Sequence, residues 1–178
     1  MKLMADSNAV TLGFATIDVT DPKFKRRFGK FVDRQLDDIQ VKKINTSYNA
    51  DGVITSLEPI PIFVRPSHIN LSSLTQDWTA NVRAPRLEWT PAGLNYGVVD
   101  FLGARHRIAA VFMYIKEKRS LIAKFQFSLD KPKLTKDAAA HATLQAQIDE
   151  ADRKIRFASR WLVVVINGGQ YRHSVSAQ

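Results

Sequence analysis

The sequence predicts an α/β fold, in which a small mixed sheet is surrounded by helices. Short apolar runs that suit strands alternate along the chain with longer segments that have helical spacing. The length of 178 residues and the apolar fraction of 45% fit one domain with a substantial core. At residues 96–118 a strand pattern, a glycine and a helix pattern follow one another directly, which is typical of α/β proteins.

The N-terminal half contains strand and helix patterns separated by turn residues. Residues 13–19 form a short apolar run that suits a strand. Residues 23–44 carry apolar side chains at helical spacing, and the turn-forming residues 45–52 follow them. The closely spaced prolines of residues 59–66 favour an edge strand, because proline cannot donate to a strand ladder. Residues 67–77 suit a short helix.

The C-terminal half has clearer periodicity. An irregular connection is expected at 78–95, because tryptophans, prolines and a glycine are mixed there without a period. The patterns that follow predict a strand at 96–102, a helix at 104–118, a strand at 121–129, a helix at 134–159 and a buried strand at 161–166.

The charge balance is strongly basic. Lysine and arginine number 26 against 17 acidic residues, which gives a formal net charge of +9. Such an excess attracts polyanions, among them nucleic acids and nucleotides. The alternative is a charge excess that only keeps the protein in solution.

The absence of cysteine and of a long apolar run excludes other classes. Disulfides, thiolate metal sites and thiol catalysis all need cysteine. The longest apolar run, Trp161 to Ile166, is far too short to span a bilayer. The first ten residues lack the apolar core of a signal peptide. We therefore expect a soluble protein of the cytoplasm or nucleus that has no membrane partner.

One segment combines backbone and side-chain features that suit phosphate. A helix N-terminus has unpaired N–H groups and a partial positive charge, so it binds anions. Arginine adds charge-assisted hydrogen bonds, and histidine can donate a hydrogen bond or carry a proton. The predicted phosphate-binding residues at this strand-to-helix turn are Gly103, Ala104, Arg105, His106 and Arg107. The alternative is an ordinary charged helix start.

Asp100 and His106 are the candidate catalytic residues. Asp100 directly precedes the turn, where a carboxylate can act as a base or help to hold a metal ion. Its alternative role is to pair with Arg105. The histidines lack the spacing of a metal site, so we predict no metal ligands.

Basic and aromatic residues outside this segment suit nucleic acid. Such basic patches bind nucleic acid without reading its sequence. The candidate nucleic-acid-binding residues in the predicted helix are Lys23, Lys25, Arg26, Arg27, Lys30 and Arg34. Arg83 and Arg86 add to a second basic footprint, and Trp78 and Trp89 suit stacking on a base or closing over a nucleotide. The alternatives are that the basic residues form a solvated helix face and that the tryptophans belong to the core.

The residues from Tyr96 to Ala110 resemble the second sequence box of the ParB/sulfiredoxin superfamily. In ParB proteins this box follows a strand and reads Gly-Glu-Arg-Arg-x-Arg-Ala-Ala. The positions of this chain that fall on the pattern are Gly103, Arg105, His106, Ala109 and Ala110. Upstream, a basic helix, a glycine-containing turn at Asp51-Gly52 and the phrase Pro-Ile-x-Val at Pro61 to Val64 also follow the family's order. The resemblance implies a ParB/sulfiredoxin-like core at about residues 15–128, with residues 129–178 as a helix-strand extension of the single domain 1–178.

The resemblance implies several ligands and activities. Relatives of this fold bind nucleotides such as ATP or CTP, with Mg²⁺ in some cases, and some bind or cut DNA or phosphorylate a small molecule. Here Ala104 replaces the usual glutamate, which argues against metal-assisted hydrolysis, and the missing cysteine excludes sulfinic acid reduction. We expect a domain that binds a nucleotide or DNA. The alternatives are an enzyme of this fold (a DNase, a nucleotide hydrolase or a small-molecule kinase) and a degenerate member that serves as a protein-interaction or inhibitor module. The extension would cover the core or form a homodimer surface.

Overall fold

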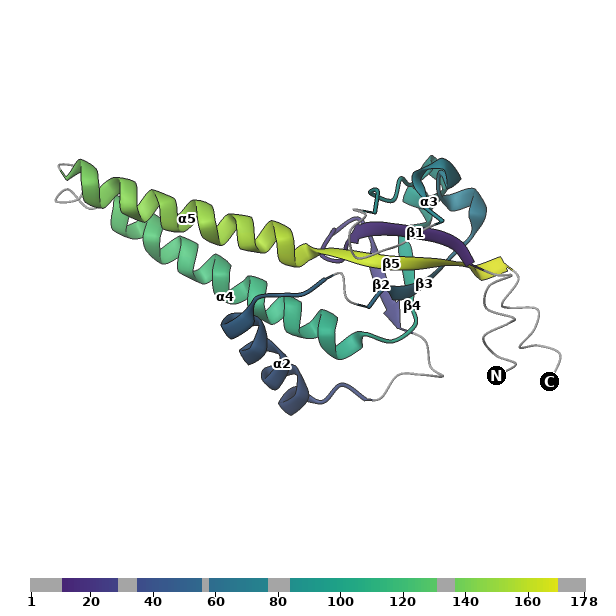
Figure 1. Ribbon diagram of the computed structural model, residues 1–178, viewed down its shortest axis with the longest axis horizontal. Coiled ribbons are helices and arrows are strands. Elements are labelled where there is room, and N and C mark those ends of the chain that lie inside the picture. Colours follow the sequence, from purple (N-terminus) through teal and green to yellow (C-terminus); the bar gives the residue numbers. More distant parts are fainter. Residues whose placement is uncertain (1–10, 29–34, 56–57, 77–83, 131–136, 170–178) are drawn as a thin grey trace. The chain divides into compact units, whose positions relative to one another are not determined.

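The computed structural model describes residues 11–28, 35–55, 58–76, 84–130 and 137–169 (Figure 1). By their internal contacts they form two compact units. The first, here called the sheet unit, comprises Met1–Leu36, Thr55–Arg105 and Arg160–Gln178. The second, the helical unit, comprises Asp37–Ile54 and His106–Ser159. Each unit therefore combines segments that are distant in the sequence.

The sheet unit is built on a mixed five-stranded sheet with the order β1-β5-β3-β4-β2. Its strands are β1 (Thr11–Asp18), β2 (Lys25–Phe28), β3 (Ile60–Val64), β4 (Val98–Phe101) and β5 (Arg160–Asn167). The pairs β1–β5 and β3–β4 are antiparallel, whereas β3–β5 and β2–β4 are parallel. The C-terminal strand β5 thus lies between the first strand and β3, and holds the sheet together.

One face of the sheet is buried. Burial alternates along β1, β3 and β4, as expected when side chains point to opposite faces in turn. The buried side chains are in register across the strands, because Ala15 and Ile60 both oppose Val163, and Ile62 opposes Val165 and Phe101. These apolar contacts form the core of the sheet unit.

The segment between β3 and β4 contributes further buried side chains, among them Ile69 and Leu87. It contains two short helical turns, η1 (Pro66–His68) and η2 (Leu71–Ser73), and the helix α3 (Pro91–Tyr96). Backbone bridges join Thr16 to Arg86 and Ile69 to Trp89. The expected irregular connection at 78–95 is thus fixed to the sheet from residue 84 onward, and it ends in a helix.

The helical unit consists of α2 (Asp38–Asp51), α4 (Arg105–Leu129, which begins one residue before this unit) and α5 (Ala138–Ser159). The Asp37 side chain caps α2 by accepting hydrogen bonds from the backbone N–H groups of Ile39 and Gln40. Helices α4 and α5 run side by side (Figure 1), and Ile122 of α4 packs with Ile148 and Ala151 of α5. Within the described residues, no helix is long and apolar enough to cross a membrane.

Several predicted elements are confirmed. The strands expected at 13–19, 96–102 and 161–166 correspond to β1, β4 and β5. The expected helix at 134–159 is α5 over its described part, and the helix expected from residue 104 is α4. The short helix expected at 67–77 is replaced by η1 and η2.

The helix predicted at 23–44 is wrong, and so is the turn at 45–52. Lys25–Phe28 form strand β2, whose parallel partner is β4. The helix starts only at Asp38 and continues through the expected turn to Asp51. Phe24 and Phe28 have helical spacing, but Arg26 and Phe28 also have the spacing of residues on one face of a strand. Pairing with β4 favours the strand over the helix.

The strand predicted at 121–129 is also wrong, because these residues continue helix α4. Ile122, Phe125 and Leu129 lie on one helix face and pack against α5. The proline-containing strand β3 is central rather than at an edge. Pro61 lies next to the end of β4, where its carbonyl accepts a hydrogen bond from the Leu102 N–H at 2.9 Å, so the missing N–H falls outside the paired residues of β3 and β4.

Candidate functional site

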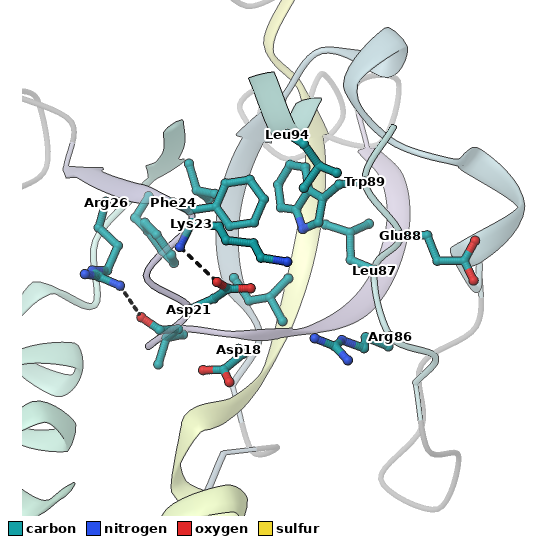
Figure 2. A pocket seen from close by; sticks show the side chains of 14 residues that line it. Asp18, Asp21, Lys23, Phe24, Arg26, Arg86, Leu87, Glu88, Trp89 and Leu94 are labelled. Carbon is teal, nitrogen blue, oxygen red and sulfur yellow. Dashed lines mark hydrogen bonds between the residues drawn. The ribbon is translucent and has the colours of Figure 1, made fainter. Parts of the chain in front are cut away.

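A pocket of about 540 Å³ lies within the sheet unit (Figure 2). Its apolar lining comes from the ends of β1 and β4 and from the segment before α3, and includes Ile17, Val19, Leu87, Val99 and Phe101. The volume is in the range of small-molecule sites, about 300–1,000 Å³. This pocket is therefore a candidate site for a small molecule.

Two aromatic rings form one side of the pocket. Phe24 is buried, Trp89 is half-buried, and their ring centroids are 4.5 Å apart with the planes tilted by 35°. The backbone bridge to Ile69 fixes Trp89 in place. A flat apolar group of a ligand can therefore pack against the exposed part of the indole.

The carboxylates of the pocket are partly used by local hydrogen bonds. Asp18 accepts from the backbone N–H and the hydroxyl of Thr20, at 2.8 and 2.6 Å. Asp21 accepts from the Lys23 backbone N–H at 2.9 Å. Glu88 accepts from the Asn70 side-chain amide at 2.9 Å, and in Figure 2 its carboxylate points away from the other labelled side chains. One oxygen of each carboxylate thus stabilises the surrounding loop.

The cations of the pocket are differently placed. The Arg26 guanidinium donates to the Val19 carbonyl at 2.9 Å. The Lys23 ammonium and the Arg86 guanidinium have no side-chain hydrogen bond or ion pair to any residue that the structure describes, and both are exposed. In Figure 2 the Lys23 side chain extends towards the middle of the view. These two groups can contact an incoming anion without breaking an existing interaction.

Asp100, a predicted catalytic residue, is bound by Arg27. Arg27 donates from Nε to one Asp100 oxygen and from Nη2 to the other, the second at 2.6 Å. This hydrogen bonding is the main cause that raises the pKa of Arg27 above its ordinary range. Both Asp100 oxygens are therefore occupied, and a role as base or metal ligand would require this pair to open. Among the described residues, no group of three acidic or histidine side chains is arranged to hold a metal ion.

The predicted phosphate loop is a strained turn that ends the sheet unit. Gly103 has φ of 86° and Ala104 has φ of 60°, an uncommon conformation for a residue with a Cβ atom. Arg105 follows as the first residue of α4, and its guanidinium carbon is 5.9 Å from the centre of the Phe28 ring. No acidic residue lies in the first turn of α4.

His106 and Arg107 belong to the helical unit. The His106 Nε2 atom accepts a hydrogen bond from the Asp37 backbone N–H at 3.0 Å, so the start of α2 uses this side chain. Arg107 lies close enough to Tyr48 to oppose the effect of burial, which raises the pKa of that tyrosine to about 12. The five residues of the predicted loop are thus divided between the two units.

The predicted nucleic-acid-binding residues are also divided. Lys23 and Arg26 line the pocket, whereas Arg27 binds Asp100. Lys25 is exposed on β2, and Lys30 and Arg34 lie outside the described residues. The structure brings Lys23 and Arg26 together with Arg86 and Trp89, which the sequence indicated only as separate basic and aromatic contacts.

The sequence analysis missed Asp18 and Asp21 as pocket residues. The turn-forming residues Asp21-Pro22 indicate a loop at this place, but a local pattern does not show that the loop lines a pocket. No protein-family model, curated protein or solved structure matches this chain. The ParB/sulfiredoxin resemblance therefore stays a prediction.

Proposed function

We propose that the sheet unit binds a nucleotide in the pocket between β1, β4 and Trp89. The observation that carries this proposal is a pair of cations, Lys23 and Arg86, that no described residue engages, at a pocket that also contains a half-buried tryptophan. Phosphate groups suit the two cations, and a base suits the indole. The carboxylate oxygens of Asp18 and Asp21 that no described group contacts suit ribose hydroxyls, which donate hydrogen bonds.

The proposal keeps the class of ligand expected from the sequence but changes its place. Val99 and Phe101 of β4, the strand that leads into residues 103–107, line the pocket, but none of residues 103–107 does. The basic character of the whole chain, with a net charge of +9, favours a polyanionic ligand, whether a nucleotide or a nucleic acid. The turn at Gly103 and Ala104 is the alternative position of the phosphates, and the experiment below separates the two.

The test is a thermal-shift titration with ATP, ADP, CTP and GTP, each with and without Mg²⁺. A ligand that binds only the folded state raises the melting temperature by mass action. We expect a rise with at least one nucleotide, and about a 10- to 100-fold loss of affinity in Arg86→Ala and in Lys23→Ala, the range of one charge-assisted hydrogen bond.

Two matched variants serve as controls. Arg65→Ala removes an exposed arginine of the same unit, and Lys25→Ala removes an exposed lysine two residues from Lys23; neither residue lines the pocket. Both controls should bind like the wild type. If Arg105→Ala abolishes binding while Arg86→Ala and Lys23→Ala do not, the nucleotide lies at the 103–105 turn. If no nucleotide raises the melting temperature, the proposal is wrong.

A further inference from the structure

A second cluster of basic and aromatic side chains surrounds Tyr96, the last residue of α3. The tyrosine is 39% exposed. Its ring is 4.9 Å from the His68 ring, and the Arg65 guanidinium carbon is 6.0 Å from its centre. The Arg27 Nη2 atom donates to the Tyr96 hydroxyl at 3.4 Å. All these residues belong to the sheet unit, and none of them lines the pocket.

The backbone below this cluster is closely packed. Gly93 of α3 lies against η1, where an added Cβ atom would be 2.1 Å from the His68 carbonyl oxygen. The Thr90 hydroxyl donates to the Ser67 carbonyl at 2.8 Å, and the Thr90 N–H donates to the His68 carbonyl at 3.0 Å. These contacts hold Tyr96 and His68 in a fixed geometry before any ligand arrives, which lowers the entropic cost of binding.

Two arginines lie at Tyr96, and because the Asp100 carboxylate neutralises Arg27, the net positive charge there comes from Arg65. Arg65 is exposed and has no ion pair with any residue in the described ranges. Arg27 uses Nε and Nη2 for Asp100, and its Nη1 atom donates to no described acceptor. Burial, followed by the charge of Arg65, lowers the pKa of His68 below its ordinary value of 6.5. At neutral pH, His68 therefore contributes an aromatic ring beside Tyr96 rather than a full positive charge.

We propose that Arg65, Arg27 and Tyr96 form a contact surface for single-stranded nucleic acid. A phosphodiester fits the two guanidinium groups, and an unpaired base fits the exposed part of the Tyr96 ring. A single strand is favoured over a duplex, because only unpaired bases offer their faces to an aromatic side chain. This surface is independent of the nucleotide pocket, since Arg27 and the pocket residue Arg26 are neighbours in β2 and point to opposite faces of the sheet.

The test is fluorescence anisotropy with a labelled oligothymidylate, whose length of about 12 nucleotides is within the usual site size of a single binding surface. We expect Tyr96→Ala to weaken binding about 5- to 150-fold, the range of one stacked base. Tyr96→Phe, which keeps the ring, should retain most of the affinity. Arg65→Ala should weaken binding and lower the slope of log K against log salt by about 0.7, the value of one phosphate contact on a single strand.

The matched control is Arg86→Ala, which removes an exposed arginine of the pocket in the same unit. It should bind the oligonucleotide like the wild type, whereas it should lose nucleotide binding, so the two proposals fail separately. Equal binding by wild type, Tyr96→Ala and Arg65→Ala would overturn the surface. So would a duplex of the same length that binds as tightly as the single strand, or an effect of Arg86→Ala as large as that of Arg65→Ala. Circular dichroism of each variant checks that it is folded.

Discussion

The two units use their charged side chains in different ways. In the helical unit, Glu150 pairs with both Arg153 and Lys154 one turn away, and the Lys118 ammonium donates to the uncharged side chain of Asn49 at 2.8 Å. In the sheet unit, Lys23 and Arg86 both line the pocket, and neither has such a partner among the described residues. The first arrangement supports helices, as neighbouring opposite charges do. The second leaves cations available, and that is why we assign ligand binding to the sheet unit.

The largest expected effect concerns the cores of the two units. Ile62 is 0% exposed in the central strand β3, whereas Ile122 is 9% exposed in the narrow contact between α4 and α5. We expect Ile62→Ala to lower the free energy of unfolding by about 3–5 kcal/mol, and Ile122→Ala by about 2 kcal/mol, because a cavity enclosed on all sides costs more than one that neighbours can fill.

Urea denaturation checks this comparison with two probes. Far-ultraviolet circular dichroism reports mainly the helices, and tryptophan fluorescence reports the sheet unit, which contains all three tryptophans, among them Trp161 at 1% exposure in β5. Coincident transitions would mean that both units unfold together. A loss of stability in Ile122→Ala equal to that in Ile62→Ala would contradict the expected difference between the cores.

The next effect concerns the contact between η1 and α3. Gly93→Ala would place a Cβ atom 2.1 Å from the His68 carbonyl oxygen, and backbone cannot rotate away as a flexible side chain can. We expect a loss of about 1–3 kcal/mol, the usual cost of overpacking, measured by thermal and urea unfolding. Gly168→Ala is the matched control, because its nearest contact would be an ordinary 3.5 Å. Equal stability of the two variants would contradict the packing at Gly93.

A smaller effect separates the ion pairs of the two units. The Arg27–Asp100 pair has two parallel hydrogen bonds and joins neighbouring strands, and its side chains are 49% and 24% exposed. A double-mutant cycle with alanine should give a coupling energy of about 1 kcal/mol that falls in high salt. The corresponding cycle for Arg153–Glu150, whose side chains are 69% and 43% exposed, should give no coupling beyond experimental error. The reverse order would contradict the two-bond pairing of Asp100 in β4 with Arg27 in β2.

The smallest effect is a pH dependence at His68. Burial lowers its pKa in the folded protein below the ordinary value of 6.5, so the unfolded chain binds the proton more tightly. The resulting contribution to stability is present above pH 6.5. It is lost as the pH falls from there through the lower pKa that His68 has in the folded protein. Unfolding free energies of wild type and His68→Gln, compared between pH 7.5 and 5, should converge towards acid pH. Parallel curves would contradict a lowered pKa.

The segments whose pattern fits one kind of element were predictable, whereas those that fit both a strand and a helix were not. Helix α5 and the buried strand β5 follow from composition and period alone, because Trp161 to Ile166 are apolar without interruption. Residues 121–129 fit both a strand and a helix, and packing of Ile122 and Leu129 on α5 decides for the helix. The placement of β5 in the middle of the sheet was not predictable either, since strand order depends on contacts that no local pattern contains.

The sequence by itself determined the class of fold, the basic charge, the absence of thiol chemistry and the residue types available for an anionic ligand. Only the tertiary structure decided which of these residues meet. It joined Lys23, Arg86 and Trp89 at one pocket, and it engaged Asp100 with Arg27 and His106 with the start of α2. The physical reason is that a side chain's charge and shape are local properties, whereas its hydrogen-bond partners come from segments brought together by burial of the apolar face of the sheet.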